Sequence, residues 1–292
     1  MKLSEALIVG MAGALIAAAL LRAANWAGTT ELQLASQPAF DRVVQTRTLR
    51  CAYSSVAGYF ANVDPTRNLT RGLVYDIVKE MGRILDLEIV WVEEIDPARV
   101  AENLAAGRED AMCFPIWPNG NQAMALDYTL PLDYVPIYAY ARADDTRFDG
   151  DLGKINGKDI VTPVIEGGIV KKIVDESFPS ATQYALPADS DAMRLLLAVT
   201  TKNADVAFAD PFTGEDFIRN NPGTLKRVAN ADPVRVFPDS FAVAKGETKL
   251  RDMMNVAIGQ MQRSGFIRAT LDKYLSAHKG LYFNPSRDWE AP

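Results

Sequence analysis

Asp205 and Asp210 stand near the two ends of the apolar segment ADVAFADP, and Asp210 directly precedes Pro211. A carboxylate at the end of a buried strand can bind a cationic group such as the amine of a ligand. It can also accept hydrogen bonds from backbone N–H groups where the chain turns at Pro211. We favour the ligand role for Asp210, because the carboxyl ends of parallel strands face the binding crevice of an open α/β sheet.

A second group of candidate ligand-binding residues combines amides with aromatic rings. Trp117, Asn119 and Gln122 lie close together in the stretch PIWPNGNQ. Trp117 stands between two prolines, which stiffen its backbone. Together with Tyr53 and Tyr59, Trp117 predicts aromatic walls that stack on a flat or cationic ligand, with ordinary packing as the alternative.

Two adjacent glycines, Gly167 and Gly168, open a segment of helical period at 167–178. Backbone N–H groups at a helix N-terminus bind anions, so this pair predicts contact with an anionic part of a ligand. Glu166, beside the glycines, and Asp210 are the attractive candidates for a general acid or base.

Charge and residue counts argue against several classes of protein. A net charge of −6 and a pI near 5.0 argue against a nucleic-acid-binding protein, which needs a basic patch. The single histidine, His278, lies in a polar stretch near the C-terminus, which argues against a histidine-based triad. One histidine and two distant cysteines predict no metal site, and no sequence pattern predicts a cofactor.

Cys51 and Cys113 lie in segments that we expect to be neighbouring parallel strands. In an oxidising compartment a disulfide between them is one outcome. Adjacent strands of one ladder often place two cysteines poorly for a bridge, and buried free cysteines are common. We therefore expect two free buried thiols.

The elements that must position these residues alternate between strands and helices. A first series in the order strand, helix, strand, helix, strand is expected at 48–53, 72–86, 87–93, 96–107 and 109–116. A second series repeats this order at 158–165, 167–178, 182–187, 190–203 and 204–210, and a strand at 240–246 and two helices within 249–275 follow. This alternation predicts an α/β fold of two similar lobes, each with a parallel sheet, and a ligand cleft between them.

The N-terminus carries a separate signal. Residues 6–21 are sixteen consecutive apolar residues. The core of a signal peptide has ~7–15 residues and a membrane-spanning helix ~20, so this segment predicts an export signal that is either cleaved or kept as an anchor. We expect a periplasmic protein, with the alternative that residues 6–21 hold it at the inner membrane.

From Phe40 to Leu275 the chain resembles the extracellular solute-binding proteins of family 3, which serve amino acid uptake by ATP-driven importers. The patterns that carry the resemblance occur in the family's order: TLRCAY, RGLVYDIVKEM, LDYTLPL, NADVAFADP and FAVAKGETKLRDMMNVAIGQMQRSGFIRATLDKYL. The resemblance implies a type II periplasmic binding protein fold, with two lobes joined by two hinge crossovers. It implies lobe one at 40–141 plus 237–280 and lobe two at 142–236. Outside the lobes, the sequence leaves a signal or anchor segment and linker at 1–39 and a C-terminal extension at 281–292.

The site implied by the resemblance departs from the family at two positions. Gln122 stands where the family has an arginine that grips the ligand carboxylate, and Gly168 stands where it has a threonine. Asp210 matches the family's aspartate that pairs with the ligand amine. The expected ligand is therefore a small polar solute that has an amine and lacks an α-carboxylate. The implied partner is an ABC permease in the membrane, and we expect a monomer that does not bind nucleic acid.

Two other functions stay open. One is a membrane-anchored sensory or structural partner protein, suggested by residues 6–21 and by the aromatic residues of the C-terminal extension. The other is an enzyme similar to cyclohexadienyl dehydratase, which would use Glu166 or Asp210. We favour a binding protein over an enzyme, because a general acid or base has so few candidates here.

Overall fold

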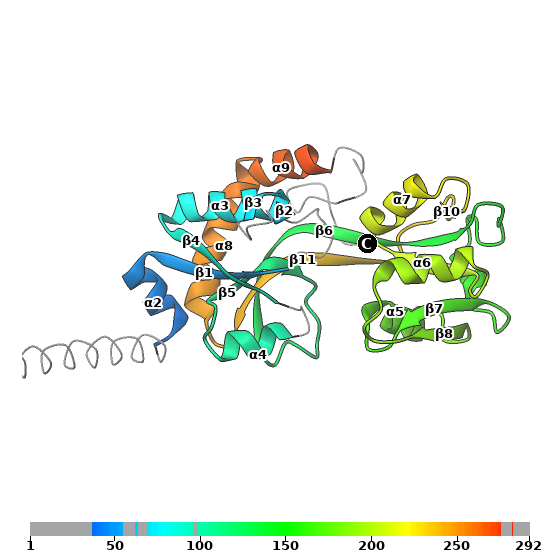
Figure 1. Cartoon of the computed structure of the whole chain (residues 1–292), viewed down its shortest axis with the longest axis horizontal. Coiled ribbons are helices and arrows are strands. Elements are labelled where there is room, and N and C mark those ends of the chain that lie inside the picture. The colour runs from blue at the N-terminus through cyan, green and yellow to red at the C-terminus, as the bar shows by residue number, and fades with distance from the viewer. Residues whose placement is uncertain (1–36, 55–61, 64–68, 96–98, 276–281, 283–292) are drawn as a thin grey trace, which may run out of the picture.

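The computed structural model shows two lobes joined by a pair of long strands (Figure 1). The structure describes residues 37–54, 62–63, 69–95, 99–275 and 282. The expected export signal or anchor at residues 6–21 lies outside this part of the chain, as does Tyr59. Within the described part, no helix is both long and apolar enough to cross a membrane.

Lobe one is built around three parallel strands, as the first strand–helix series predicts. β1 (Thr48–Tyr53) lies between β4 (Glu88–Glu94) and β5 (Ala111–Ile116). The helices α3 (Leu73–Leu85), α8 (Thr248–Arg263) and α9 (Phe266–Tyr274) pack together on one side of these strands, and α4 (Val100–Ala105) lies on the other (Figure 1). The lobe also contains α2 (Ala39–Thr46), β2 (Asn62–Val63) and β3 (Leu69–Arg71).

The helix α3 forms where the apolar period predicts it. Leu73, Ile77 and Met81 recur on one face and are buried in the core of lobe one. Asp86 ends the helix in the left-handed region at φ 53°, and its backbone N–H bonds to the carbonyl of Gly82. A Cβ atom at Gly82 would lie 2.8 Å from the side chain of Ile89, so the helix is pressed closely onto β4.

Lobe two repeats the strand–helix order on a smaller scale. β7 (Val161–Ile165) and β8 (Thr182–Leu186) pair in parallel, and α5 (Ile169–Ser177) connects them. The lobe is completed by η2 (Leu152–Ile155), α6 (Ala192–Thr200), β9 (Val206–Ala209), α7 (Pro211–Asn220) and β10 (Leu225–Arg227). The sequence pattern does not predict α7, although Pro211 occupies a first-turn position that suits proline.

Two antiparallel strands, β6 (Leu126–Arg142) and β11 (Arg235–Ala244), run from lobe one into lobe two (Figure 1). The sequence predicts only the last part of β11 and none of β6. These strands join both lobes into one mixed sheet of order β10-β6-β11-β5-β1-β4, in which β9 also pairs with β6. The parallel strands stay at the centre of lobe one, and the crossing strands add the antiparallel pairs.

The apolar cores show where β6 and β11 cross from one lobe to the other. Leu132 of β6 and Phe241 of β11 are buried in the core of lobe one. Ile137 of β6 packs instead with Phe148 and Phe208 in the core of lobe two. The chain therefore passes from one core to the other over a few residues of each strand. The residue limits given above for the two lobes stay a prediction.

Cys51 and Cys113 form a disulfide, which corrects the expectation of two free thiols. They lie on neighbouring parallel strands, as expected. Both belong to the same buried cluster on the α3 side of the sheet, and their Cα atoms are 5.3 Å apart. This separation is one that a disulfide spans, so the stagger between β1 and β5 permits the bridge.

Candidate functional site

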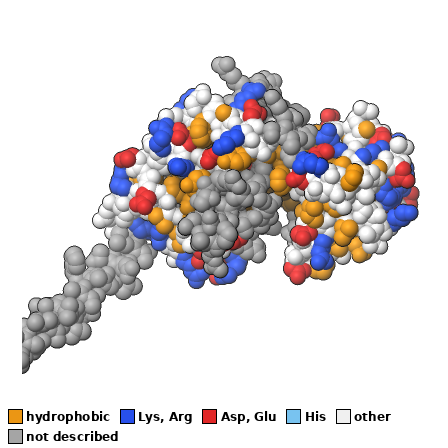
Figure 2. All heavy atoms as spheres, turned by 45° about the horizontal axis from the view of Figure 1, so that its top comes forward, with side chains coloured by type: hydrophobic (Ala, Val, Ile, Leu, Met, Phe, Trp, Pro, Cys, Tyr) orange, Lys and Arg blue, Asp and Glu red, His pale blue; other side chains and the backbone are white. Residues whose placement is uncertain are grey.

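A polar hollow lies between the two lobes (Figure 2). It has a volume of about 400 Å³. One wall is the loop after β5, and the other is the start of α5. The lining residues are Asn119, Gly120, Asn121 and Gln122 from lobe one, and Gly167, Gly168, Ile169, Lys171, Lys172 and Asp175 from lobe two.

Four of the eight residues proposed from the sequence line this hollow: Asn119, Gln122, Gly167 and Gly168. They come from separate lobes and meet because each follows the carboxyl end of a parallel strand. Trp117, Tyr53 and Asp210 are not among its lining residues. Whether any of these residues binds a ligand stays a prediction.

The loop after β5 holds its amides in a fixed arrangement. Asn119 Nδ2 donates to Gln122 Oε1 at 2.8 Å, and the backbone N–H of Gln122 donates to Asn119 Oδ1 at 3.0 Å. The hydroxyl of Tyr128 also donates to Gln122 Oε1, at 3.3 Å. The lobe-one wall is therefore made of neutral, mutually bonded amides, and a carboxylate here would meet no guanidinium.

The opposite wall offers backbone N–H donors at the start of α5. Gly167 has φ 76°, a conformation that glycine adopts readily, and Gly168 precedes the first turn of α5. The backbone N–H groups of that turn and the helix dipole favour negative charge. Lys171 and Lys172 also line this wall, but each is paired with a carboxylate one turn later: Lys171 with Asp175 at 3.2 Å and Lys172 with Glu176 at 3.9 Å. This wall suits an anionic or strongly polar part of a solute.

Asp210 lies at the start of α7 and accepts hydrogen bonds there. Its Oδ1 atom accepts from the backbone N–H of Thr213 at 3.0 Å, and its Oδ2 atom accepts from the Thr213 hydroxyl at 2.7 Å. The capping role that the sequence leaves open is thus present. Each carboxylate oxygen can accept further bonds, so capping does not prevent contact with an amine.

The aromatic candidates differ in their surroundings. Tyr53 is buried and makes an edge-on contact with Trp91 at 6.0 Å between ring centroids. Trp117 is only half-buried and stacks on Phe237 at 4.7 Å, with 12° between the ring planes. Its indole Nε1–H donates to Asp239 Oδ1 at 2.7 Å. Trp117 therefore joins the loop beside the hollow to β11.

Sequence reasoning did not single out Asp133 and Asp239, which lie opposite each other on β6 and β11. Burial raises the pKa of Asp133 to about 7. The pKa of Asp239 is also raised well above its usual range, by burial first and then by the negative charges of Asp133 and Asp210. No local pattern could have shown this pair, because only the pairing of two distant strands brings it together.

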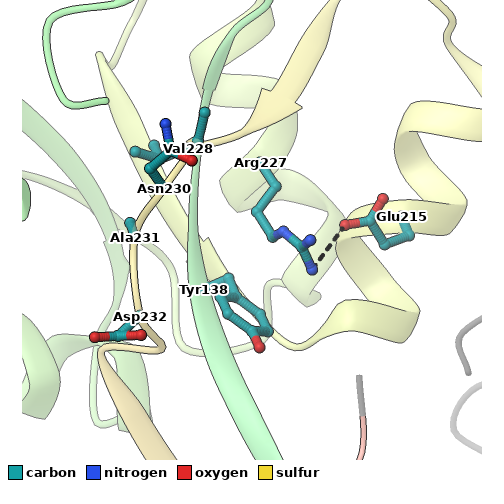
Figure 3. A pocket seen from close by; sticks show the side chains of 8 residues that line it. Tyr138, Glu215, Arg227, Val228, Asn230, Ala231 and Asp232 are labelled. Atoms are coloured by element: carbon teal, nitrogen blue, oxygen red, sulfur yellow. Dashed lines mark ion pairs between the residues drawn. The ribbon is translucent and has the colours of Figure 1, made fainter. Parts of the chain in front are cut away.

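A second hollow lies on lobe two beside β10 and β6 (Figure 3). It has a volume of about 650 Å³. The guanidinium of Arg227 lies over the ring of Tyr138 at 4.7 Å and pairs with Glu215 at 3.7 Å. Arg227 and Glu215 compensate each other there, and Asp232 adds a further negative charge to the lining. In the described part of the chain, no cluster of histidine, cysteine, aspartate or glutamate side chains could hold a metal ion.

Two α/β lobes, two connecting strands and a polar hollow between the lobes define a binding protein of the type II periplasmic class. Comparison with family models gives the same result. The chain belongs to the bacterial extracellular solute-binding proteins, family 3, whose model matches residues 58–277. No curated protein sequence matches the chain.

Solved structures share this fold at low sequence identity. An ancestral amino acid-binding protein, described as a precursor of cyclohexadienyl dehydratase, is 17% identical with a TM-score of 0.66; the alignment covers 82% of this chain and 99% of that one. The cysteine-binding protein from Campylobacter jejuni is 17% identical with a TM-score of 0.64, covering 86% and 97%. A histidine kinase sensor domain is also 17% identical, with a TM-score of 0.63 and coverage of 82% and 98%.

Proposed function

We propose that this solute-binding protein captures a small polar, amine-containing solute between its lobes in the periplasm and delivers it to an ABC-type importer. The observation that carries the proposal is the shared hollow, in which Asn119 and Gln122 of one lobe and Gly167 and Gly168 of the other line the same space. A site of this kind is completed when the lobes close on a ligand.

The charges around the hollow support the choice of solute. The amides of Asn119 and Gln122 offer no positive charge to a carboxylate. Asp210 does not line the hollow in this arrangement, and in the proposal its negative charge meets the amine when the lobes close. The start of α5 offers N–H donors to a polar or anionic substituent. Family membership supports the importer as partner, and the amino acid-binding proteins of the same fold support a small polar solute.

A sensory role is the second candidate. One observation favours it, the likeness to a histidine kinase sensor domain. In that case residues 6–21 would stay in the membrane and pass the bound state to a partner. Two results together would favour this candidate over the importer. The purified chain would bind a solute but stimulate no uptake, and in cells residues 6–21 would hold the chain at the membrane.

The proposed function is tested by thermal-shift measurements on the full chain with panels of amines, amino acids, polyamines and neutral solutes. A solute at ~100 times its dissociation constant stabilises the folded state by about 2.7 kcal/mol. We expect stabilisation by amines. A response to neutral solutes alone would contradict the proposed solute class, and turnover of a cyclohexadienyl acid would contradict a pure binding protein.

A matched pair of variants separates the two roles of Asp210. Asp191 caps α6 in the same lobe by accepting from the backbone N–H of Arg194, as Asp210 caps α7. Asparagine caps helices about as well as aspartate. We expect Asp210→Asn to lower the amine response while Asp191→Asn leaves it unchanged. Equal responses from both variants would show that the Asp210 charge does not contact the solute.

A further inference from the structure

Asp133 and Asp239 are directly paired across β6 and β11, the two strands that connect the lobes. The register of the ladder shifts next to this pair, since Ser240 is opposite Pro131 while Asp239 is opposite Asp133. An extra residue in one strand is a β-bulge, a device that bends the strand and increases its twist. The two carboxyl groups therefore lie at a local bend between the two cores.

Both carboxyl groups are buried, with 2% of Asp133 and 3% of Asp239 exposed. Asp239 accepts one hydrogen bond, from Trp117 Nε1. Asp133 Oδ2 is buried and has no hydrogen-bond partner among the residues that the structure describes. Opposed residues of an antiparallel pair have Cα atoms about 4.5–5.5 Å apart and side chains on one face. Two buried carboxylates so placed cannot both be ionised without a large cost.

The described groups that face the pair add no positive charge. Asp210, at the start of α7, adds its negative charge to Asp239. Tyr282 is near all three carboxylates, and the pKa of its hydroxyl is raised first by its own burial and then by their charges. The residues of α8 that reach β6 here are uncharged: Asn255 and Gln262 bond to the backbone of Leu130 and Pro131. In the described part of the chain, neither Asp133 nor Asp239 has a lysine or arginine partner.

We propose that Asp133 and Asp239 are a proton-binding pair that sets how far the two lobes open. With one proton on the pair, one carboxyl group donates to the other, which gives Asp133 Oδ2 the partner it lacks. Loss of this proton places two negative charges opposite each other in the connecting strands. Their repulsion acts at the bulge and favours an arrangement in which water reaches the carboxylates and the lobes are further apart.

Trp117 transmits this change to the hollow. Its ring is fixed by Asp239 Oδ1 and by stacking on Phe237. Asn119, which lines the hollow, bonds to the backbone carbonyl of Trp117 at 3.4 Å. A shift of Asp239 therefore moves the loop that forms the lobe-one wall. The inference concerns the protein without solute, so it can fail or hold independently of the proposed solute class.

The test follows the full chain from pH 5 to pH 8.5 with two readouts. Tryptophan fluorescence, corrected with a Trp117→Phe variant, reports on the bond to Asp239. The radius of gyration from small-angle X-ray scattering reports on lobe separation. In the wild type we expect a single transition in both readouts, with a larger radius at high pH. Asp133→Asn and Asp239→Asn should each abolish the radius transition, because one carboxylate has no opposed charge to repel it. The fluorescence midpoint of Asp133→Asn should move down by about one pH unit or more, and the double variant should lose both transitions.

Glu109→Gln is the control, because Glu109 is another buried carboxyl group with a raised pKa, caused first by burial, and it lies outside the connecting strands. It should leave both transitions unchanged. A fluorescence transition at constant radius would overturn the link to opening, and the absence of both transitions would overturn the proton pair. The two single variants keep the test decisive if the double variant does not fold.

Discussion

The ring of Tyr140 lies directly against the backbone of Gly214, where a Cβ atom would come 2.1 Å from the Tyr140 Cζ atom. Tyr140 is fully buried in the core of lobe two, so its ring has no free space to move into. We expect Gly214→Ala to lower the free energy of unfolding by about 1–3 kcal/mol, the usual cost of overpacking. Urea unfolding measures this change. Gly120→Ala is the matched control: a Cβ atom there meets nothing within 4 Å, and its effect should stay within about 0.5 kcal/mol.

The disulfide between Cys51 and Cys113 closes a long loop, since the two residues are 62 positions apart. Cross-linking such a loop restricts the unfolded chain, so reduction should lower the free energy of unfolding by about 2–4 kcal/mol. Thermal unfolding with and without a reductant measures the loss. The double variant Cys51→Ala, Cys113→Ala should unfold at the same temperature in both conditions. If the reductant lowered the unfolding temperature of the variant as much as that of the wild type, its effect would not come from this disulfide.

Asp76 ties two helices of lobe one together. Its Oδ2 atom accepts from Lys273 Nζ at 2.7 Å and from the Tyr274 hydroxyl at 2.9 Å. Lys273 is mostly exposed, so its ion pair adds little in water. We expect Asp76→Ala to cost about 1 kcal/mol of stability, mainly through the Tyr274 bond, and to leave solute binding unchanged. Tyr274→Phe should cost a similar amount and Lys273→Ala much less; the opposite order would contradict this assignment.

The pH dependence of stability follows from the buried pair. The pKa of Asp133 rises from 3.8 to about 7 on folding, so the folded chain binds more protons than the unfolded chain between these values. The free energy of unfolding should therefore fall as the pH rises from 3.8 to about 7, and the raised pKa of Asp239 acts in the same direction. Asp133→Asn, which carries no charge at any pH, should flatten this decline. Urea unfolding at a series of pH values measures the slope.

Asp127 is the control for that slope, because the sign of its shift is opposite. The hydrogen bond from Lys245 lowers the pKa of Asp127 below its usual value. Asp127 therefore contributes to the free energy of unfolding at neutral pH, and this contribution is lost as the pH falls below about 4. Asp127→Asn should weaken the acid limb and keep the decline between pH 4 and 7. A wild-type curve that is flat over that range would contradict the raised pKa of Asp133.

Local patterns were enough to predict the elements that position the hollow. The periods of β1, α3, β5 and α5 are set by residues close together in the chain. The family resemblance singled out Gln122 and Gly168, and both line one hollow because each follows the carboxyl end of a parallel strand. Gly168 also has a steric reason for its type, since a Cβ atom there would lie 3.1 Å from the carbonyl oxygen of Ile165.

Features that depend on distant pairing were missed. β6 contains Pro131 and Pro136, and prolines argue against a strand inside a sheet because they cannot donate to the ladder. One of them lies beside the shift in register, where a break in the ladder tolerates it. The disulfide was missed for a related reason: the stagger between β1 and β5 depends on the assembled sheet. The pairing of Asp133 with Asp239 also depends on the assembled sheet.

The neutral wall of the hollow gives a last prediction, which rests on the proposed solute site. Gln122 stands where related proteins are expected to have an arginine, and its side chain is held by Asn119 and Tyr128 beside the hollow. An arginine there would supply two parallel donors to a carboxylate, an interaction that a glutamine cannot make.

We expect Gln122→Arg to tighten the binding of amino acids with a free α-carboxylate by about tenfold or more, which corresponds to ~1.4 kcal/mol. Titration calorimetry with an amino acid and with the amine that lacks its carboxylate measures the difference. Asn121→Arg adds the same charge to the same loop one position away. An equal gain from this control would mean that general attraction, rather than a specific contact at position 122, selects the carboxylate.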